Sequence, residues 1–516
     1  MNFSKEHSEN TVHNYQRHPI FRHPIFQRNF LFCTRRYKVL LISLMLLLSA
    51  CHTHLSQNDT LFSSGSSGTI KHTGKHNIYV TLSALQHARI LKIYGGAYHN
   101  VKLERMLADI VYKLTSISHD SQQSYSITIL DSDSVNAFAL PSGFIYITRG
   151  MLALANDSSQ VAGILAHEIA HITAHHGILR LKKQAELKMA SHLTPRSLSP
   201  STSNSYSPLN NKQQLAQFSR NQELEADSLA LENLTQAGYN PFAFPRFLQS
   251  MEAYSAFRNI SGAQNASLDF LASHPTTPRR IRLAREKARK ISTMYKGNTD
   301  RDSFLKNLDG MVFGGNSHTG FVRGNQFIHP QLRITFSVPN NFTMENSMHT
   351  VLASGPENIA LRFDAVPYSP GMSASDYLKS GWIAGLDESS VHTITIEGFS
   401  GARARATNQQ WQFDIIVILH NNHIFRFLTA APHDSQNFAA VVEKIIQSFH
   451  PLSSSQLKKL KPLRIHVVSV KQGESIASLA NQMAHVPHKE QLFRILNGFS
   501  PTQTLNGGSK VKLVTQ

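Results

Sequence analysis

The chain has 516 residues, of which 41% are hydrophobic and 16% are charged. This length predicts two to four domains, and the hydrophobic content is sufficient for packed cores. The only cysteines are Cys33 and Cys51, which excludes a scaffold held together by disulfides. The net charge of +18 would by itself permit binding to nucleic acid or to an anionic surface.

Residues 1–50 have the pattern of a leader with a secretory signal. A basic stretch at residues 35–38 precedes an apolar run at residues 39–48, which is too short to span a bilayer. The run ends in Leu-Ser-Ala-Cys, which resembles a bacterial lipobox. We therefore expect Cys51 to be lipidated, the alternative being a helical anchor with an incidental cysteine. No aspartate follows Cys51, so the resemblance to Gram-negative lipoprotein sorting implies the periplasmic face of the outer membrane.

Export limits the partners that the composition permits. Residues 1–50 account for +5 of the net charge, which leaves +13 for the mature chain. Because an exported protein does not meet nucleic acid, we expect none as a partner, and contact with anionic lipid head groups stays a hypothesis. Residues 51–80 are rich in Ser, Gly, Thr and His, which predicts a flexible tether.

The segment 81–300 opens with helical patterns that extend to residue 117, followed by strand patterns at residues 124–130 and 144–148. Its central stretch, residues 161–178, reads VAGILAHEIAHITAHHGI. This stretch predicts a helix because alanine and other apolar residues are plentiful and no proline interrupts them.

Within this helix His167, Glu168 and His171 fit the HExxH pattern. Two residues four apart lie above one another on a helix, so both imidazoles can point at one metal ion. Catalytic zinc takes three protein ligands and keeps a fourth position for water, and Glu168 is placed to accept a proton from that water. The pattern alone is also compatible with two ordinary histidines, so the zinc interpretation needs a third ligand.

A third ligand is available on a later predicted helix. The metzincin continuation is excluded, because the chain has Ala174 and Gly177 where that class has glycine and histidine. About fifty residues after HExxH, Glu223 and Asp227 are four apart, so one can bind the metal while the other orients a ligand histidine. Glu225 lies nearly on the opposite face, which favours Glu223.

Three stretches in combination carry a family resemblance: HEIAH at residues 167–171, SRNQELEAD at residues 219–227 and SHPTTPRRI at residues 273–281. They resemble the gluzincin family of HtpX and the CAAX prenyl endopeptidases, and are most similar to its soluble periplasmic branch, which includes the beta-barrel-assembly-enhancing proteases. A fourth stretch, NAFALPSG at residues 136–143, precedes the helix as it does in that branch. The resemblance covers residues 81–300.

The resemblance implies a role for each matching residue. His167, His171 and Glu223 would hold one zinc ion per chain, with Glu168 as the general base. Asp227 would hold a ligand histidine in place.

Two further residues match positions with family roles. His274 matches a histidine that reaches the metal in some relatives and blocks its open position; the alternative is an ordinary loop histidine. Arg280 matches an arginine thought to stabilise the developing oxyanion. In this family a strand along the cleft can pair with extended substrate, so residues 136–143 would line the cleft, the alternative being plain core strands.

Residues 191–211, between the two metal-binding helices, are dense in Ser, Pro and Asn and predict a mobile loop. Its position beside the cleft makes it a candidate lid, and the alternative is a simple connector.

The rest of the chain predicts two accessory parts. Residues 301–452 predict an antiparallel α+β domain with no catalytic constellation, for which binding or docking is the default role. Residues 463–516 resemble a LysM module, in which a strand, two helices and a strand bind N-acetylglucosamine-containing glycans; peptidoglycan is therefore a candidate partner. The expected secondary-structure elements of the α+β domain are strands at residues 332–338, 359–364, 393–396, 410–419 and 423–429, and a helix at residues 438–448.

The predicted fold class is α+β multidomain, with a mainly helical zincin-type peptidase domain and a small sheet, an antiparallel α+β domain and a βααβ module. The predicted function is a zinc-dependent endopeptidase of misfolded or stalled envelope proteins, anchored in the periplasm as an outer-membrane lipoprotein. The rival functions are a non-cleaving chaperone or scaffold for outer-membrane protein assembly and a glycan-tethered assembly factor. A pure scaffold has no need for Glu168 beside the ion, which favours catalysis.

Overall fold

The structure is a computed structural model that describes residues 85–117, 123–193, 208–260, 270–292, 300–347, 349–368, 371–484 and 486–516. The predicted leader, Cys51, the tether of residues 51–80 and residues 194–207 of the candidate lid lie outside these ranges. Apart from residues 381–384, the described residues belong to one compact unit. No helix within the described ranges is both long and apolar enough to cross a bilayer.

The first domain contains a three-stranded sheet. Strands β1 (Ser126–Leu130) and β3 (Phe144–Thr148) are parallel neighbours, and β2 (Ala137–Ala139) pairs antiparallel with the other side of β3. The chain reaches this sheet through α3 (Val101–Ser116), whose first amides are capped by the side chain of Asn100. Because β2 is an edge strand and packs against the helix α5, it borders the site described below.

The helix α5 (Ser158–Thr173) carries the HExxH residues, and all but two of its residues are buried. An apolar surface on all sides of a helix is typical of a helix enclosed by other elements. The side chain of Asp157 caps it by accepting from the amide of Gln160. Gly163 permits a close crossing with α8 (Ala243–Ile260), because a Cβ at this position would lie 3.1 Å from the Phe244 Cβ.

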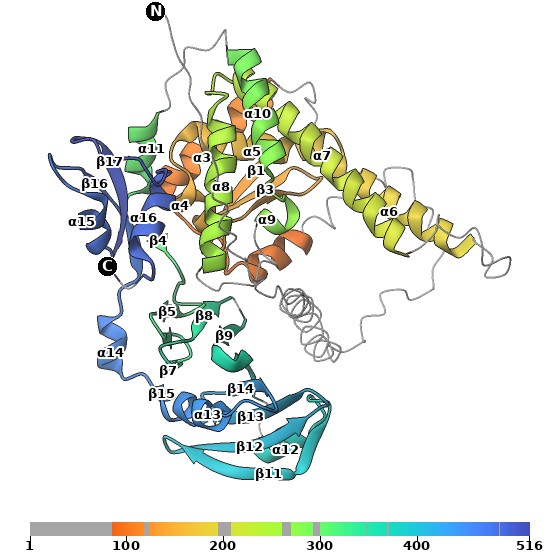
Figure 1. Ribbon diagram of the computed structural model, residues 1–516, viewed down its shortest axis with the longest axis vertical. Coiled ribbons are helices and arrows are strands. Elements are labelled where there is room, and N and C mark those ends of the chain that lie inside the picture. The colour runs from red at the N-terminus through yellow and green to blue at the C-terminus, as the bar shows by residue number, and fades with distance from the viewer. Residues whose placement is uncertain are drawn as a thin grey trace, which may run out of the picture. The chain divides into compact units, whose positions relative to one another are not determined.

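Three more helices complete the site. The long helix α7 (Pro208–Gln236) packs against α5, and α10 (Pro278–Ile291) packs against both α7 and α8. The one-turn helix α9 (Phe270–Ser273) precedes α10, which begins at Pro278; the hydroxyl of Thr277 caps α10 by accepting from the amide of Arg280. These helices and the strands β1 and β3 are labelled in Figure 1.

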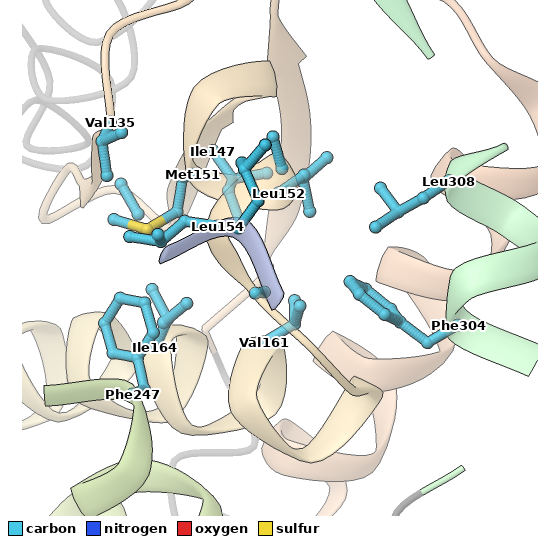
Figure 2. Packing of buried hydrophobic residues seen from close by; sticks show 14 of the residues in the cluster. Val135, Ile147, Met151, Leu152, Leu154, Val161, Ile164, Phe247, Phe304 and Leu308 are labelled. Atoms are coloured by element: carbon cyan, nitrogen blue, oxygen red, sulfur yellow. The ribbon is translucent and has the colours of Figure 1, made fainter. Parts of the chain in front are cut away.

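One hydrophobic core joins the sheet, α4 (Arg149–Leu154), α5, α8 and α11 (Arg301–Leu308). The sequence predicts that the peptidase domain ends at residue 300. In the structure α11 nevertheless buries its apolar side chains in the core of this first domain. Figure 2 shows members of the core from each of these elements: Ile147, Met151, Ile164, Phe247, Phe304 and Leu308.

Two antiparallel sheets form the accessory domain. The larger has the order β11-β12-β13-β14-β10-β9-β8, the smaller has the order β15-β7-β6-β5, and α13 (Phe438–Gln447) packs into their common core. The smaller sheet contains β5 (Phe321–Arg323), β6 (Gln326–His329), β7 (Ile334–Ser337) and β15 (His450–Pro451). The larger sheet contains β8 (Thr343–Asn346), β9 (Val351–Ser354), β10 (Ala360–Pro367), β11 (Leu386–Ile396), β12 (Phe399–Thr407), β13 (Trp411–His420) and β14 (His423–Pro432). The described part of the domain also contains α12 (Ala374–Lys379) and the 3-10 helix η3 (Pro356–Asn358).

The C-terminal part follows the short helix α14 (Ser454–Lys459) and has the expected order strand, helix, helix, strand. Its elements are β16 (Leu463–Ser469), α15 (Ile476–Asn481), α16 (Lys489–Asn497) and β17 (Lys510–Thr515). Strand β16 pairs with β17 on one side and with β4 (Val312–Phe313) on the other. The accessory sheets are thus inserted between two neighbouring strands, and glycan binding by the C-terminal part stays a prediction.

Buried polar contacts join this C-terminal part to the first domain. Lys512 is fully buried, and its Nζ donates to the carbonyls of Ala153 and Ala155 at 2.7 and 2.6 Å. These carbonyls belong to the last turn of α4 and its cap, where helix carbonyls lack partners within the helix and the Lys512 side chain supplies one. The core cluster of the first domain also includes apolar residues of β16, α15, α16 and β17, so the two parts share one core.

Candidate metal centre

His167 and His171 project from one face of α5. Their Nε2 atoms are 3.1 Å apart, as expected for residues one helical turn apart. His167 is fully buried, whereas His171 is partly exposed. The two rings therefore direct one nitrogen each to the same point.

Glu223 on α7 and His274 after α9 reach the same point. Nδ1 of His274 lies 3.3 Å from Nε2 of His167 and 2.9 Å from Oε1 of Glu223. The Glu223 carboxylate lies 3.4 Å from Nε2 of His171 and 3.5 Å from Nε2 of His167. The structure thus brings together all three predicted ligands and His274, with one donor atom each within 4.8 Å of the others.

These separations fit a tetrahedral metal ion. Ligand atoms that lie 2.0–2.1 Å from a tetrahedral zinc ion are roughly 3.3–3.4 Å from one another. His167 approaches this spacing with His171 at 3.1 Å and with His274 at 3.3 Å, and the Glu223 carboxylate approaches it with both α5 histidines at 3.4 and 3.5 Å, while the whole set lies within 4.8 Å. Their chemistry, three imidazoles and a carboxylate, is typical of zinc ligands. Burial alone would raise the pKa of Glu223, but hydrogen bonds from the three histidines hold it far below its usual range. The carboxylate therefore stays ionised, as a metal ligand must be.

Glu168 lies beside the ligand atoms and has a different environment. It is 2% exposed, and Oε1 has no hydrogen-bond partner among the described residues. Nε2 of His274 lies 3.6 Å from this oxygen. Burial raises the pKa of Glu168, which brings the carboxylate closer to the range of an efficient general base near neutral pH.

Asp227 and Arg280 hold the far side of His167. Oδ1 of Asp227 lies 3.1 Å from Nδ1 of His167. Burial raises the pKa of Asp227, but hydrogen bonds from Arg280 and His167 outweigh burial and lower it. Asp227 is thus placed to fix the ring so that Nε2 faces the other ligand atoms, the arrangement expected from the sequence.

Arg280 occupies a different environment from the one that an oxyanion-binding role implies. It is 4% exposed; Nε and Nη2 donate to the two oxygens of Asp227 at 2.8 and 2.7 Å. Nη1 donates to the carbonyl of Pro275 at 3.0 Å and lies 2.9 Å from Oε2 of Glu223. The guanidinium therefore bridges two buried carboxylates, and stabilisation of an oxyanion stays a prediction.

His176 is a site residue that the sequence reasoning missed. Its Nδ1 lies 2.9 Å from Nδ1 of His171, and its Nε2 lies 3.3 Å from Oε2 of Glu225. The available signal was the pair of histidines that follows HExxH. Helical periodicity could not assign it, because His175, with a φ of 54°, ends α5 before the start of α6 (His176–Leu193).

The predicted cleft segment, residues 136–143, contains the edge strand β2 and packs near α5. Among the described residues no strand pairs with β2 on the side away from β3, so a substrate strand could add there. Of the candidate lid, residues 191–193 belong to α6 and residues 208–211 to α7.

Comparison with known proteins agrees with this geometry. The family model "Peptidase family M48" matches residues 98–288. The chain is 28% identical to "Mitochondrial metalloendopeptidase OMA1" of Schizosaccharomyces pombe, over 38% of this chain and 57% of that protein. It is 26% identical to "Beta-barrel assembly-enhancing protease" of Yersinia pestis, over 35% of this chain and 37% of that protein. The histidine and glutamate cluster lies within the matched segment, and we conclude that residues 98–288 form a peptidase domain that matches family M48.

Proposed function

We propose that the chain is a zinc-dependent endopeptidase that hydrolyses peptide bonds of misfolded or stalled proteins of the cell envelope. The observation that carries this proposal is the convergence of His167, His171 and Glu223 beside the unpartnered oxygen of Glu168. The match spans only part of each relative, so substrate and location are proposals in their own right.

The roles of the side chains follow from their surroundings. A zinc ion bound by His167, His171 and Glu223 would act as a Lewis acid toward water and the scissile carbonyl. Glu168 would accept the proton of the attacking water at Oε1 and deliver it to the leaving amine. The raised pKa of Glu168 favours the first of these transfers, because the carboxylic acid that forms is less costly in a buried site than the carboxylate.

His274 would close the site at rest. Its Nδ1 lies among the ligand atoms, and its Nε2 faces Glu168. A ring in this position occupies the space of the water and also lies next to the base that would deprotonate it. Substrate hydrolysis would then require the His274 side chain to move away from the ligand atoms.

Location and substrate are supported by the sequence and by the names of relatives. The lipobox at Cys51 supports an outer-membrane lipoprotein facing the periplasm, and a relative named a beta-barrel assembly-enhancing protease supports envelope proteins as clients. The free edge of β2 supports an unfolded substrate, because only an extended chain can add to a strand. Peptidoglycan stays a candidate partner of residues 463–516.

The direct test is cleavage of unfolded casein by the full chain, with zinc content recorded for each variant. We expect Glu168→Gln to retain zinc and to lose cleavage by about 10²-fold or more, since it removes the general base. Glu186→Gln, at an exposed position on α6, is the matched control and should cleave like the wild type. Equal cleavage by wild type and Glu168→Gln would contradict the proposal.

The second candidate is a chaperone or scaffold that retains the metal site without cutting. One observation favours the scaffold: His274 lies with the three other candidate ligands, and four protein ligands are typical of a structural zinc site. The unpartnered Glu168 oxygen favours the peptidase. The chaperone would be supported if zinc-loaded wild type binds casein without cutting it and the zinc-loaded His274→Ala variant does not cut it either.

A further inference from the structure

The two histidines of α5 have different outer partners. Nδ1 of His167 faces the buried carboxylate of Asp227 at 3.1 Å. Nδ1 of His171 instead faces another imidazole nitrogen, Nδ1 of His176, at 2.9 Å. His176 is 3% exposed, and its Nε2 continues to the Glu225 carboxylate at 3.3 Å. The three side chains therefore form a continuous line from the ligand cluster to the surface.

The order of atoms along this line assigns the protons. A histidine that offers Nε2 to a metal carries its one ring proton on Nδ1, so His171 donates from Nδ1. His176 must accept at its own Nδ1, which leaves its proton on Nε2. That proton is donated to Glu225, so each nitrogen has one consistent role and the line ends in an acceptor.

The backbone holds His176 in this position. His175 adopts a left-handed conformation, with a φ of 54°, and thereby separates α5 from α6, which starts at His176. Nε2 of Gln222, on α7, donates to the carbonyl of His176 at 3.0 Å. Glu225 lies three residues after Gln222 on the same helix, so α7 contacts both the backbone and the ring of His176.

We propose that His176 and Glu225 are positioning residues for the metal ligand His171. They hold its ring so that Nε2 faces the metal and raise the basicity of that nitrogen through the hydrogen bond at Nδ1. This inference rests on the proposed zinc-peptidase function. Because Glu225 is 62% exposed whereas Asp227 is buried, the support of His171 is open to solvent at its outer end and that of His167 is not.

The experiment measures zinc affinity of the full chain by competition with a chromophoric chelator. We expect His176→Asn to weaken zinc binding by about 10- to 100-fold, the usual effect of removing an outer partner of a ligand histidine. Glu225→Ala should weaken it by a smaller factor, because water can replace an exposed carboxylate. His175→Asn is the matched control: it changes a neighbouring, exposed histidine, keeps a residue tolerant of positive φ, and should leave the affinity unchanged.

A second readout separates positioning from general destabilisation. In the cobalt-substituted protein, a reoriented His171 should shift the visible absorption bands of the His176→Asn variant, while the thermal midpoint of the metal-free protein stays close to that of the wild type.

The outcomes are distinguishable. Wild type that binds no zinc overturns the proposed function itself. Wild type and His176→Asn with equal zinc affinity overturn only the positioning role. If His176→Asn does not fold, Glu225→Ala decides alone: weaker zinc binding supports the proposal, and unchanged binding overturns it.

Discussion

Replacement of Arg280 by methionine distinguishes a positioning role from the oxyanion role suggested by the family resemblance. In the structure Arg280 donates two hydrogen bonds to Asp227 and contacts Glu223 at 2.9 Å, while only 4% of the residue is exposed. Methionine fills much of the same volume but leaves both carboxylates without their cation. We therefore expect loss of stability and of zinc affinity, besides any loss of cleavage.

The magnitude follows from these contacts. Three charge-assisted contacts at about 1.5–3 kcal/mol each would give a gross loss of roughly 5–9 kcal/mol. Part of this is recovered because the guanidinium no longer has to be buried, and removal of one partner from a buried ion pair costs about 3–5 kcal/mol net. We expect the metal-free Arg280→Met variant to unfold with a free energy lower by this net amount.

Urea unfolding of the metal-free protein, followed by far-UV circular dichroism, measures that loss, because the first domain is mainly helical. Arg279→Met is the control, since it removes a neighbouring exposed arginine of the same helix. Zinc affinity and casein cleavage are measured on the same preparations. If Arg280→Met keeps wild-type stability and zinc affinity and loses only turnover, the positioning argument is refuted and the oxyanion role is favoured.

Three further predictions concern other parts of the chain. At saturating zinc, His274→Ala should raise kcat/KM for casein by roughly 10-fold if about 90% of the protein is closed at rest; unchanged kinetics would exclude a closed resting state. Burial lowers the pKa of His329 to about 4 from 6.5, so the unfolded state binds a proton first and stability is lost as pH falls from about 6.5 toward 4. Both tryptophans lie in the accessory segment, so unfolding followed by tryptophan fluorescence measures its stability. Between pH 7 and 5 the free energy of unfolding of wild type should fall by about 2 kcal/mol more than that of His329→Asn, and an equal fall in both proteins would contradict this. Asn497→Ala removes the hydrogen-bond partners of the buried backbone N–H and C=O of Lys512, which should lower the free energy of unfolding by about 2–4 kcal/mol. The C-terminal part and the first domain should unfold in one transition, and a separate transition for the C-terminal part would disprove the shared core.

The metal centre was predictable because its signals are local. The spacing of His167 and His171 places two nitrogens on one helix face whatever the rest of the chain does. The same argument applies to Glu223 and Asp227, which reach one ligand cluster from a single face of α7. No spacing rule states which group a neighbouring side chain contacts. The oxyanion role of Arg280 comes from the family resemblance and stays a prediction, whereas its hydrogen bonds to the Asp227 carboxylate are visible only in the structure.

Several strands of the accessory domain were not predictable for a related reason. Strands β5, β6, β8 and β9 have three or four residues each, which is too short for an alternating pattern to stand out. Strand β12 alternates alanine with arginine, and Arg403 is satisfied only by Asp414 on the next strand and Glu443 on α13. Its buried face consists of small residues whose strand preference is weak until the neighbouring strands are in place.

The insertion of the accessory sheets shows most clearly where local patterns lose their information. Strand β4 has two residues, and it is a strand only because β16, about 150 residues later, pairs with it. Arg149, which is far from β4 in the sequence, also holds this strand, because its Nη1 donates to the carbonyl of Val312 at 2.7 Å. The sequence predicts that the accessory domain starts at residue 301, because no local pattern in this stretch indicates its pairing with β16. The C-terminal part is therefore joined to the peptidase domain through residues on both sides of the insertion. Because both parts lie in one core, a substitution at Asn497 should also lower the stability of the helices that carry the metal ligands.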